Sequence, residues 1–171
     1  MAGAPEETLR AVVYGIGAAF VAVFCYATAA GLPGLHEPYW APLTALVVLY
    51  PDRKGTLKAG LQYFIGTAIG SAIGWACAAL WHGHLAAYGA GVALAIGAAH
   101  VLRCDAAARL SAVAVTLITI VPHPESPHLI ALLRFVEVSY GVACALAYTL
   151  AADLVAKRVL AGRRSHARNA G

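Results

Sequence analysis

The longest uncharged segment of this chain lies between Lys58 and Arg103 and reads AGLQYFIGTAIGSAIGWACAALWHGHLAAYGAGVALAIGAAHVL, residues 59–102. These 44 residues contain no Asp, Glu, Lys or Arg. A helix needs about 20 apolar residues to cross the ~30 Å hydrocarbon core of a bilayer, so this segment is long enough for two crossings. A buried helix of a soluble protein would be interrupted by polar positions well before that length.

Three further stretches lack charged residues, namely residues 11–36, 110–124 and 138–152. Hydrophobic residues make up 61% of the 171-residue chain and charged residues only 12%, whereas about a quarter of a soluble domain is charged. The length is that of one domain. We therefore predict an all-α integral membrane protein that forms a single bundle, and not a soluble enzyme.

Turn-forming residues divide the apolar runs into six helices. The cluster Gly31-Leu32-Pro33-Gly34 ends the first helix, Pro51 ends the second, and Ser126-Pro127 opens the sixth. After a short cytoplasmic N-terminus at residues 1–8, we predict helices over residues 9–30, 37–50, 57–81, 85–102, 106–121 and 127–159, and then a frayed basic tail at 160–171. The second helix is short for a full crossing, so it is tilted, enters the membrane only partway, or is sheltered by its neighbours.

The positions of lysine and arginine predict the orientation, because short cytoplasmic loops carry an excess of both. Six helices that cross the membrane in alternating directions place all basic residues except Arg134 on one side. We therefore expect a protein of the bacterial inner membrane with both termini in the cytoplasm. Five of these residues are expected to form the cytoplasmic mouth of an anion path: Arg53, Lys54, Lys58, Arg103 and Arg109. Their location at membrane ends argues against nucleic-acid binding.

Small residues recur at four-residue spacing in the third predicted helix, at Gly66, Gly70 and Gly74. Because lipid gives no hydrophobic drive for helix association, small residues act by allowing close backbone approach. The fourth predicted helix has a comparable stripe at Gly89, Ala93 and Gly97 and is the expected partner. We interpret these positions, and Gly141 in the sixth predicted helix, as helix-packing residues.

Arg134 and Glu137 are charged residues inside the sixth predicted helix. Their i,i+3 spacing lets them pair on one face, and charges at membrane depth mark either a transport pathway or a buried pair. Both interpretations stay open at this stage. In the first interpretation, Arg134 attracts an anionic substrate and Glu137 modulates or neutralises the charge of Arg134. In the second, the pair holds the sixth helix against a neighbouring helix.

Other polar and aromatic positions also have two interpretations. Trp40 belongs either to an interfacial aromatic belt or to a stacking platform for an aromatic substrate, and Thr44 and Thr67 either bond to their own helix or line a polar lumen. Five histidines expected on the extracytoplasmic side are loop residues or proton sensors, and the pair His82 and His84 is alternatively a weak metal site. The five are His36, His82, His84, His123 and His128. The four scattered cysteines are expected to pack in the core. We find no catalytic, metal or cofactor motif.

Several segments resemble the fusaric acid resistance, or aromatic acid exporter, superfamily. They are PYWAPLTALVVL from residue 38, KGTLKAGL from residue 54, GTAIG from residue 66, and LRFVE from residue 133 with Gly141. The resemblance implies a six-helix unit that exports organic acids, and it extends distantly to plant malate channels of similar organisation. The matching positions are Trp40, Pro42, Thr44, Gly66, Thr67, Gly70, Arg134, Glu137 and Gly141.

The chain departs from the family pattern in two ways. Tyr63 stands where family members commonly carry an arginine of the pathway, and we count it among the expected pathway residues. The single unit also lacks the duplication and cytosolic domain of many exporters. We therefore expect a homo-oligomer in the lipid bilayer that exports small aromatic acid anions. The alternatives are an anion channel without proton coupling and a membrane scaffold that binds partners without transport.

Overall fold

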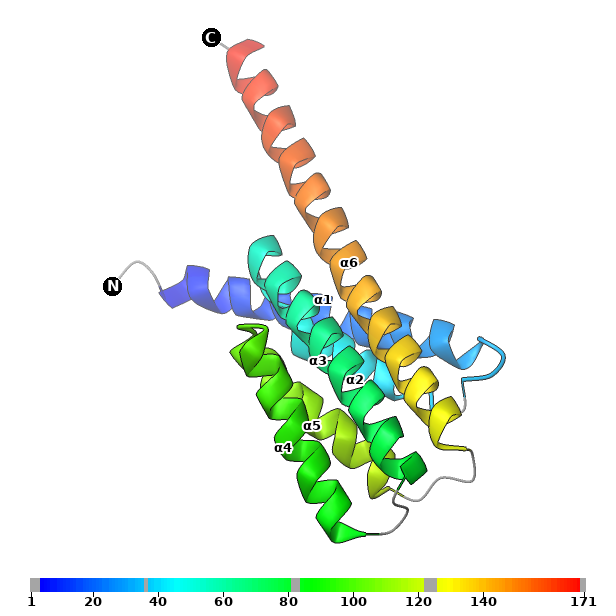
Figure 1. Ribbon diagram of the computed structural model, residues 1–171. Coiled ribbons are helices and arrows are strands. Elements are labelled where there is room, and N and C mark those ends of the chain that lie inside the picture. The colour runs from blue at the N-terminus through cyan, green and yellow to red at the C-terminus, as the bar shows by residue number, and fades with distance from the viewer. Residues whose placement is uncertain (1–3, 36, 81–83, 122–125, 170–171) are drawn as a thin grey trace.

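The computed structural model describes residues 4–35, 37–80, 84–121 and 126–169, which form helices joined by turns. In Figure 1, α3 to α6 run side by side, α1 crosses them obliquely, and the C-terminal part of α6 extends beyond the other helices. The helices in the described residues are α1 (Ala4–Ala30), α2 (Trp40–Val48), α3 (Arg53–Leu80), α4 (Leu85–Val101), α5 (Asp105–Thr119) and α6 (Pro127–Asn169).

The helices of the described residues differ in whether they can cross a membrane. Three are long and apolar enough, over Glu7–Ala30, Arg53–Leu80 and Pro127–Arg158. α4 and most of α5 are apolar but shorter, and α2 has only nine residues. At 1.5 Å per residue α2 is ~14 Å long, less than half of the ~30 Å core. The expected number of helices is therefore found, whereas the length for a full crossing is found in three of them.

The chain leaves the helical path directly after α2. Leu49 is extended, with φ −74° and ψ 120°, and Pro51 follows. Side chains form hydrogen bonds with the backbone groups that have no helical partner. The Tyr14 hydroxyl donates to the carbonyl of Leu49 at 2.8 Å. Oγ1 of Thr56 accepts the N–H of Tyr50 at 3.0 Å and donates to the carbonyl of Tyr50 at 3.1 Å. Side chains of the protein therefore supply the hydrogen bonds that the helix no longer makes at this point.

Two helices begin at positions that differ from expectation. α2 occupies residues 40–48 and not 37–50, because residues 38–39 form a turn and the chain is extended from Leu49. α3 begins at Arg53 and not at residue 57, because the Asp52 carboxylate accepts the N–H of Gly55 at 2.7 Å and caps the helix. The expected end of this helix at residue 81 lies outside the described residues.

The remaining ends differ in the same manner. α1 begins at Ala4 and not at residue 9, and α5 spans Asp105–Thr119 and not 106–121. α6 continues to Asn169, so most of the tail expected to fray at 160–171 is helical. Alanine, lysine and arginine are good helix formers, and they allow the helix to continue past the apolar span.

The glycine stripe of α3 faces α5. A Cβ added at Gly66 would lie 2.7 Å from the carbonyl oxygen of Ala107, and one added at Gly70 would lie 2.5 Å from Cβ of Ala114. At Gly74 the added atom would lie 3.2 Å from Cα of Val115. The two backbones therefore approach closely because these positions have no side chain.

The expectation that α4 is the partner of this stripe is wrong. A Cβ added at Gly89 or Gly97 would meet nothing within 4 Å, and Ala93 is exposed. α4 instead turns Gly91 inward, where an added Cβ would lie 2.8 Å from Sγ of Cys77. Four-residue spacing identifies a helix face that can pack closely, but it does not tell which face is turned inward.

A second packing centre joins α1, α2 and α6. Apart from Leu49, its buried side chains are small or β-branched, and all four cysteines are free. Gly141 of α6 faces the carbonyl of Ala41, and a Cβ there would lie 2.8 Å from Cβ of Thr44. The buried residues are Val21, Cys25, Ala29, Ala41, Ala45, Val48, Leu49, Val138, Val142 and Ala145.

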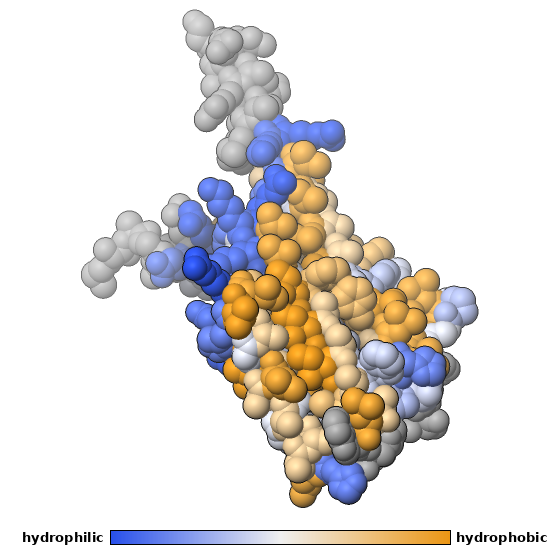
Figure 2. Space-filling model, in the orientation of Figure 1, coloured by the Kyte–Doolittle hydropathy of each residue, from blue (hydrophilic) through white to orange (hydrophobic). Residues whose placement is uncertain are grey.

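The outer surface of the bundle is largely apolar. On the face that Figure 2 shows, hydrophobic residues cover the helices, most hydrophilic residues lie toward the end from which α6 projects, and a few lie at the right-hand side and the lower end. Large apolar side chains such as Phe20, Leu94 and Leu132 are exposed. Contiguous apolar surface of this extent is what a bilayer covers.

Candidate functional site

Arg134 and Glu137 are buried in α6. Arg134 is 6% exposed and Glu137 only 1%, and Nη1 of the arginine donates to Oε2 of the glutamate at 3.0 Å. Arg134 lies seven residues after Pro127, which places it ~10 Å along the helix axis. Two charged residues that are one turn apart on a helix can pair in this way without help from another element.

Glu37 brings a second carboxylate to Arg134 from the turn before α2. Its Oε2 forms an ion pair with Nη2 of Arg134 and accepts a hydrogen bond from Nε1 of Trp40 at 3.1 Å. Cζ of Arg134 also lies 4.5 Å from the centroid of the Trp40 ring, within the range of a cation–π contact. We call Glu37, Trp40, Arg134 and Glu137 the Arg134 cluster.

The two carboxylates of the Arg134 cluster differ in their surroundings. The side chain of Glu137 is 2% exposed, whereas that of Glu37 is 31% exposed. Glu137 shares a helix with Arg134, whereas Glu37 lies in a turn. An unpaired charge in a buried site is costly, so separation from the guanidinium is unfavourable for the buried Glu137. It is less unfavourable for Glu37, because the side chain of Glu37 has access to water.

A cavity of about 80 Å³ lies beside the cluster, between α2, α3, α5 and α6. Trp40 and Arg134 form part of its wall, and the hydroxyl-bearing residues Thr44, Tyr63 and Thr67 form another part. Its other lining residues are apolar: Leu43, Val47, Leu110, Val113, Ala114, Leu117 and Val138. An apolar pocket with a few convergent polar groups is the usual form of a small-molecule site.

The structure brings five of the six expected pathway residues together around this cavity. They come from three helices: Trp40 and Thr44 from α2, Tyr63 and Thr67 from α3, and Arg134 from α6. Glu137, the sixth, contacts the cavity only through Arg134.

Sequence reasoning missed Glu37 as a partner of Arg134. Its one signal was its place directly before Pro38, at the start of the PYWAPLTALVVL segment. Only the packing of α2 against α6 shows that this carboxylate meets the arginine.

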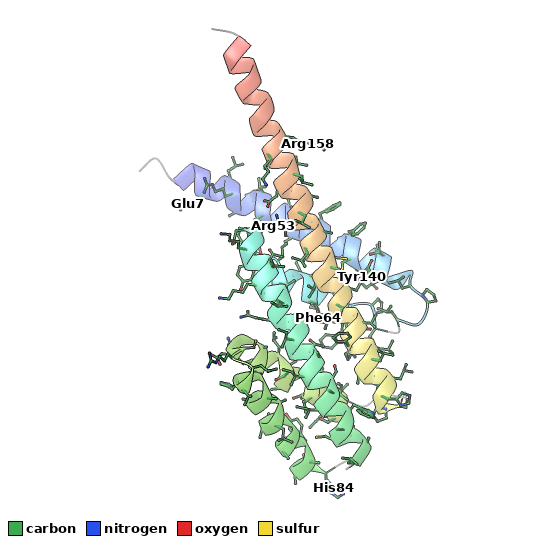
Figure 3. All side chains as sticks on the ribbon, turned by 45° about the horizontal axis from the view of Figure 1, so that its top comes forward. Glu7, Arg53, Phe64, His84, Tyr140 and Arg158 are labelled. Carbon is green, nitrogen blue, oxygen red and sulfur yellow. The ribbon has the colours of Figure 1, made fainter. Side chains whose placement is uncertain are left out.

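The residues expected at the cytoplasmic mouth lie apart from the cluster. Arg53, Lys54 and Lys58 are exposed on the first turns of α3, and Arg103 and Arg109 are exposed where α4 meets α5. In Figure 3, Arg53, Arg158 and Glu7 all lie toward the end of the bundle opposite His84. Of the five histidines considered above, His36, His82 and His123 lie outside the described residues, and His84 and His128 are exposed.

The comparisons with known proteins identify one family. The family described as fusaric acid resistance protein-like matches residues 21–148, about three quarters of the chain and including the whole Arg134 cluster. No curated protein and no solved structure matches the chain. These findings do not show the distant similarity to plant malate channels.

Proposed function

The chain belongs to the fusaric acid resistance protein-like family, and on that basis we propose that it exports small aromatic acid anions across the bacterial inner membrane. Membership in the family indicates a membrane protein with a role in transport or resistance. The observation that carries the finer proposal is a buried guanidinium, Arg134, in the wall of a mainly apolar cavity. Such a site offers charge to a carboxylate and apolar surface to a ring.

The proposed topology has both termini in the cytoplasm. The labelled residues Arg53 and Arg158 lie toward one end of the bundle in Figure 3, as expected if that end faces the cytoplasm. A basic mouth raises the local concentration of anions. α2 would then connect the two sides together with the non-helical residues that flank it, since its own length covers less than half of the bilayer core.

A homo-oligomer is part of this proposal. Only 17% of the apolar span of α1 is buried within the protein, so lipid or a second copy of the chain covers most of this helix. The mass of the purified protein–detergent complex, determined by light scattering, gives the copy number. A strictly monomeric protein that still transports would remove the oligomer from the proposal.

Flux of radiolabelled benzoate into liposomes tests the proposed function. Benzoate carries the carboxylate and the aromatic ring that the site is expected to bind. Replacing Arg134 alone by glutamine would leave Glu137 buried without a partner at a cost of roughly 3–5 kcal/mol, so the double variant R134Q/E137Q is the better choice. It removes both charges; glutamine keeps the shape of the Glu137 side chain and is shorter than the side chain of Arg134.

The proposal predicts that the double variant inserts and folds but loses benzoate flux. The control is R158Q, which removes an exposed charge at the end of the bundle and should leave most of the flux intact. Wild-type flux in the folded double variant would refute the role of Arg134. Unitary currents in a planar bilayer would instead favour the anion channel, and absence of flux for every aromatic acid tested would favour the scaffold.

A further inference from the structure

The carboxylate of Glu37 occupies a site built from two donors. Nη2 of Arg134 and Nε1 of Trp40 both reach the same oxygen, Oε2. A guanidinium and an indole N–H are the donors that bind a carboxylate oxygen strongly in a partly dehydrated site. The same wall opens onto the apolar part of the cavity, so the two donors lie next to a surface suited to an aromatic ring.

The charges of the Arg134 cluster disfavour a further anion in the observed arrangement. With both carboxylates ionised, one guanidinium faces two negative charges. A substrate carboxylate added to this set would meet like charge without a free partner, which is unfavourable at low dielectric. One of the resident carboxylates therefore has to leave or take up a proton before an anion binds.

Exposure and chain position identify the one that leaves. Glu37 is the more exposed carboxylate and lies in a turn, whereas Glu137 is buried one helical turn from Arg134. The cavity beside the two donors measures about 80 Å³, whereas an apolar cavity that binds benzene in another protein measures ~150 Å³. Binding of a ring therefore requires the site to widen.

We propose that the Arg134–Trp40 donor pair is the carboxylate subsite for an aromatic monocarboxylate, and that Glu37 is an internal carboxylate that the substrate displaces. This inference rests on the proposed function and adds to it the position of the substrate's charged group and the group that closes the site. Glu37 is thus a positioning residue that sets affinity by competition.

Fluorescence of Trp40 provides a binding assay that is independent of transport. The other two tryptophans, Trp75 and Trp81, are replaced by phenylalanine, and the purified protein in lipid nanodiscs is titrated with benzoate. Benzamide, which has the ring without the charge, is the control ligand. Benzoate in the subsite lies against the indole and should change its emission, whereas benzamide should bind much more weakly.

Two matched variants separate competition from a general charge effect. E37Q and E137Q each remove one negative charge from the cluster, but only E37Q weakens the group that occupies the subsite. We expect E37Q to tighten benzoate binding by about tenfold or more, the size of one charge-assisted hydrogen bond, and E137Q to change it far less. E37D keeps the charge but shortens the side chain, so it should also tighten benzoate binding. It replaces E37Q in the assay if E37Q does not fold.

The outcomes distinguish the inference from the function on which it rests. Equal tightening in E37Q and E137Q, or no change in E37Q and E37D, would overturn the displacement of Glu37 even if flux of benzoate depends on Arg134. Tighter benzoate binding in E37Q together with no flux in any variant would support the subsite and refute the exporter. No benzoate binding to wild type, E37Q or E37D would overturn both.

Discussion

Replacing Gly70 by alanine tests the close contact between α3 and α5. The added Cβ would lie 2.5 Å from Cβ of Ala114 and 2.9 Å from Cα of Ser111. Backbone and a β-carbon cannot move aside as the end of a long side chain can, so the two helices have to separate. Overpacking of this kind costs roughly 1–3 kcal/mol, while alanine itself favours the helix by about 0.5–1 kcal/mol over glycine. We expect a net loss of roughly 0.5–2 kcal/mol.

Gly97 provides the matched control within the same chain. It lies in α4, and an added Cβ would meet nothing within 4 Å. Gly97→Ala should therefore show only the gain in helix propensity, about 0.5–1 kcal/mol. The difference between the two variants is then ~1–3 kcal/mol, in opposite directions from wild type.

Equilibrium unfolding in mixed micelles, followed by circular dichroism, gives the free energy of unfolding of each variant. The quantity that matters is the difference between Gly70→Ala and Gly97→Ala, because both substitutions add the same methyl group. If both variants shift stability in the same direction and by the same amount, the glycine stripe is not a packing contact with α5. The assignment of the α3–α5 interface would then be wrong.

Three further substitutions test other parts of the fold and the site. Gly141→Ala places a methyl group against the carbonyl of Ala41 and should push α2 away from α6. Because small displacements of groups in a site can lower its activity by up to about 10²-fold, we expect benzoate flux to fall by up to this factor. Unchanged flux would contradict this expectation. Thr56→Val leaves both backbone groups of Tyr50 without their partner and should cost about 1–3 kcal/mol in the same unfolding assay, whereas Thr56→Ser should not. Arg103 has φ 56°, so Arg103→Gly should raise stability by up to ~1 kcal/mol; a loss of stability would speak against the left-handed turn.

The class of the protein was accessible from the sequence because membrane insertion depends on local composition. The uncharged segment 59–102 has the length of two crossings whatever its neighbours do. Turn chemistry at Pro51 and Ser126-Pro127 separates the helices in the same local way. The residues of the Trp40 to Thr67 region could be selected because their pattern resembles that of the family.

Other features depended on the tertiary structure. Residue spacing along a helix shows which face of the helix can pack closely, but it does not show which neighbouring helix covers that face. Stripes of small residues occur in both α3 and α4, and only the packing shows that α5 covers the first and leaves Gly89 and Gly97 uncovered. The reduced length of α2 is likewise a tertiary effect, since Tyr14 and Thr56 supply the bonds that replace helical ones.

The Arg134 cluster shows the same division. The sequence determined that Arg134 and Glu137 share one helix face and can pair, because they stand at i,i+3 spacing, and the structure shows the bond between them. That Glu37 joins them was decided by the fold, which brings a residue 97 positions away in the chain to the same guanidinium. A carboxylate in a turn has no periodicity that would indicate its partner. Its contact with Arg134 comes from the packing of α2 against α6, which approach each other closely at Gly141.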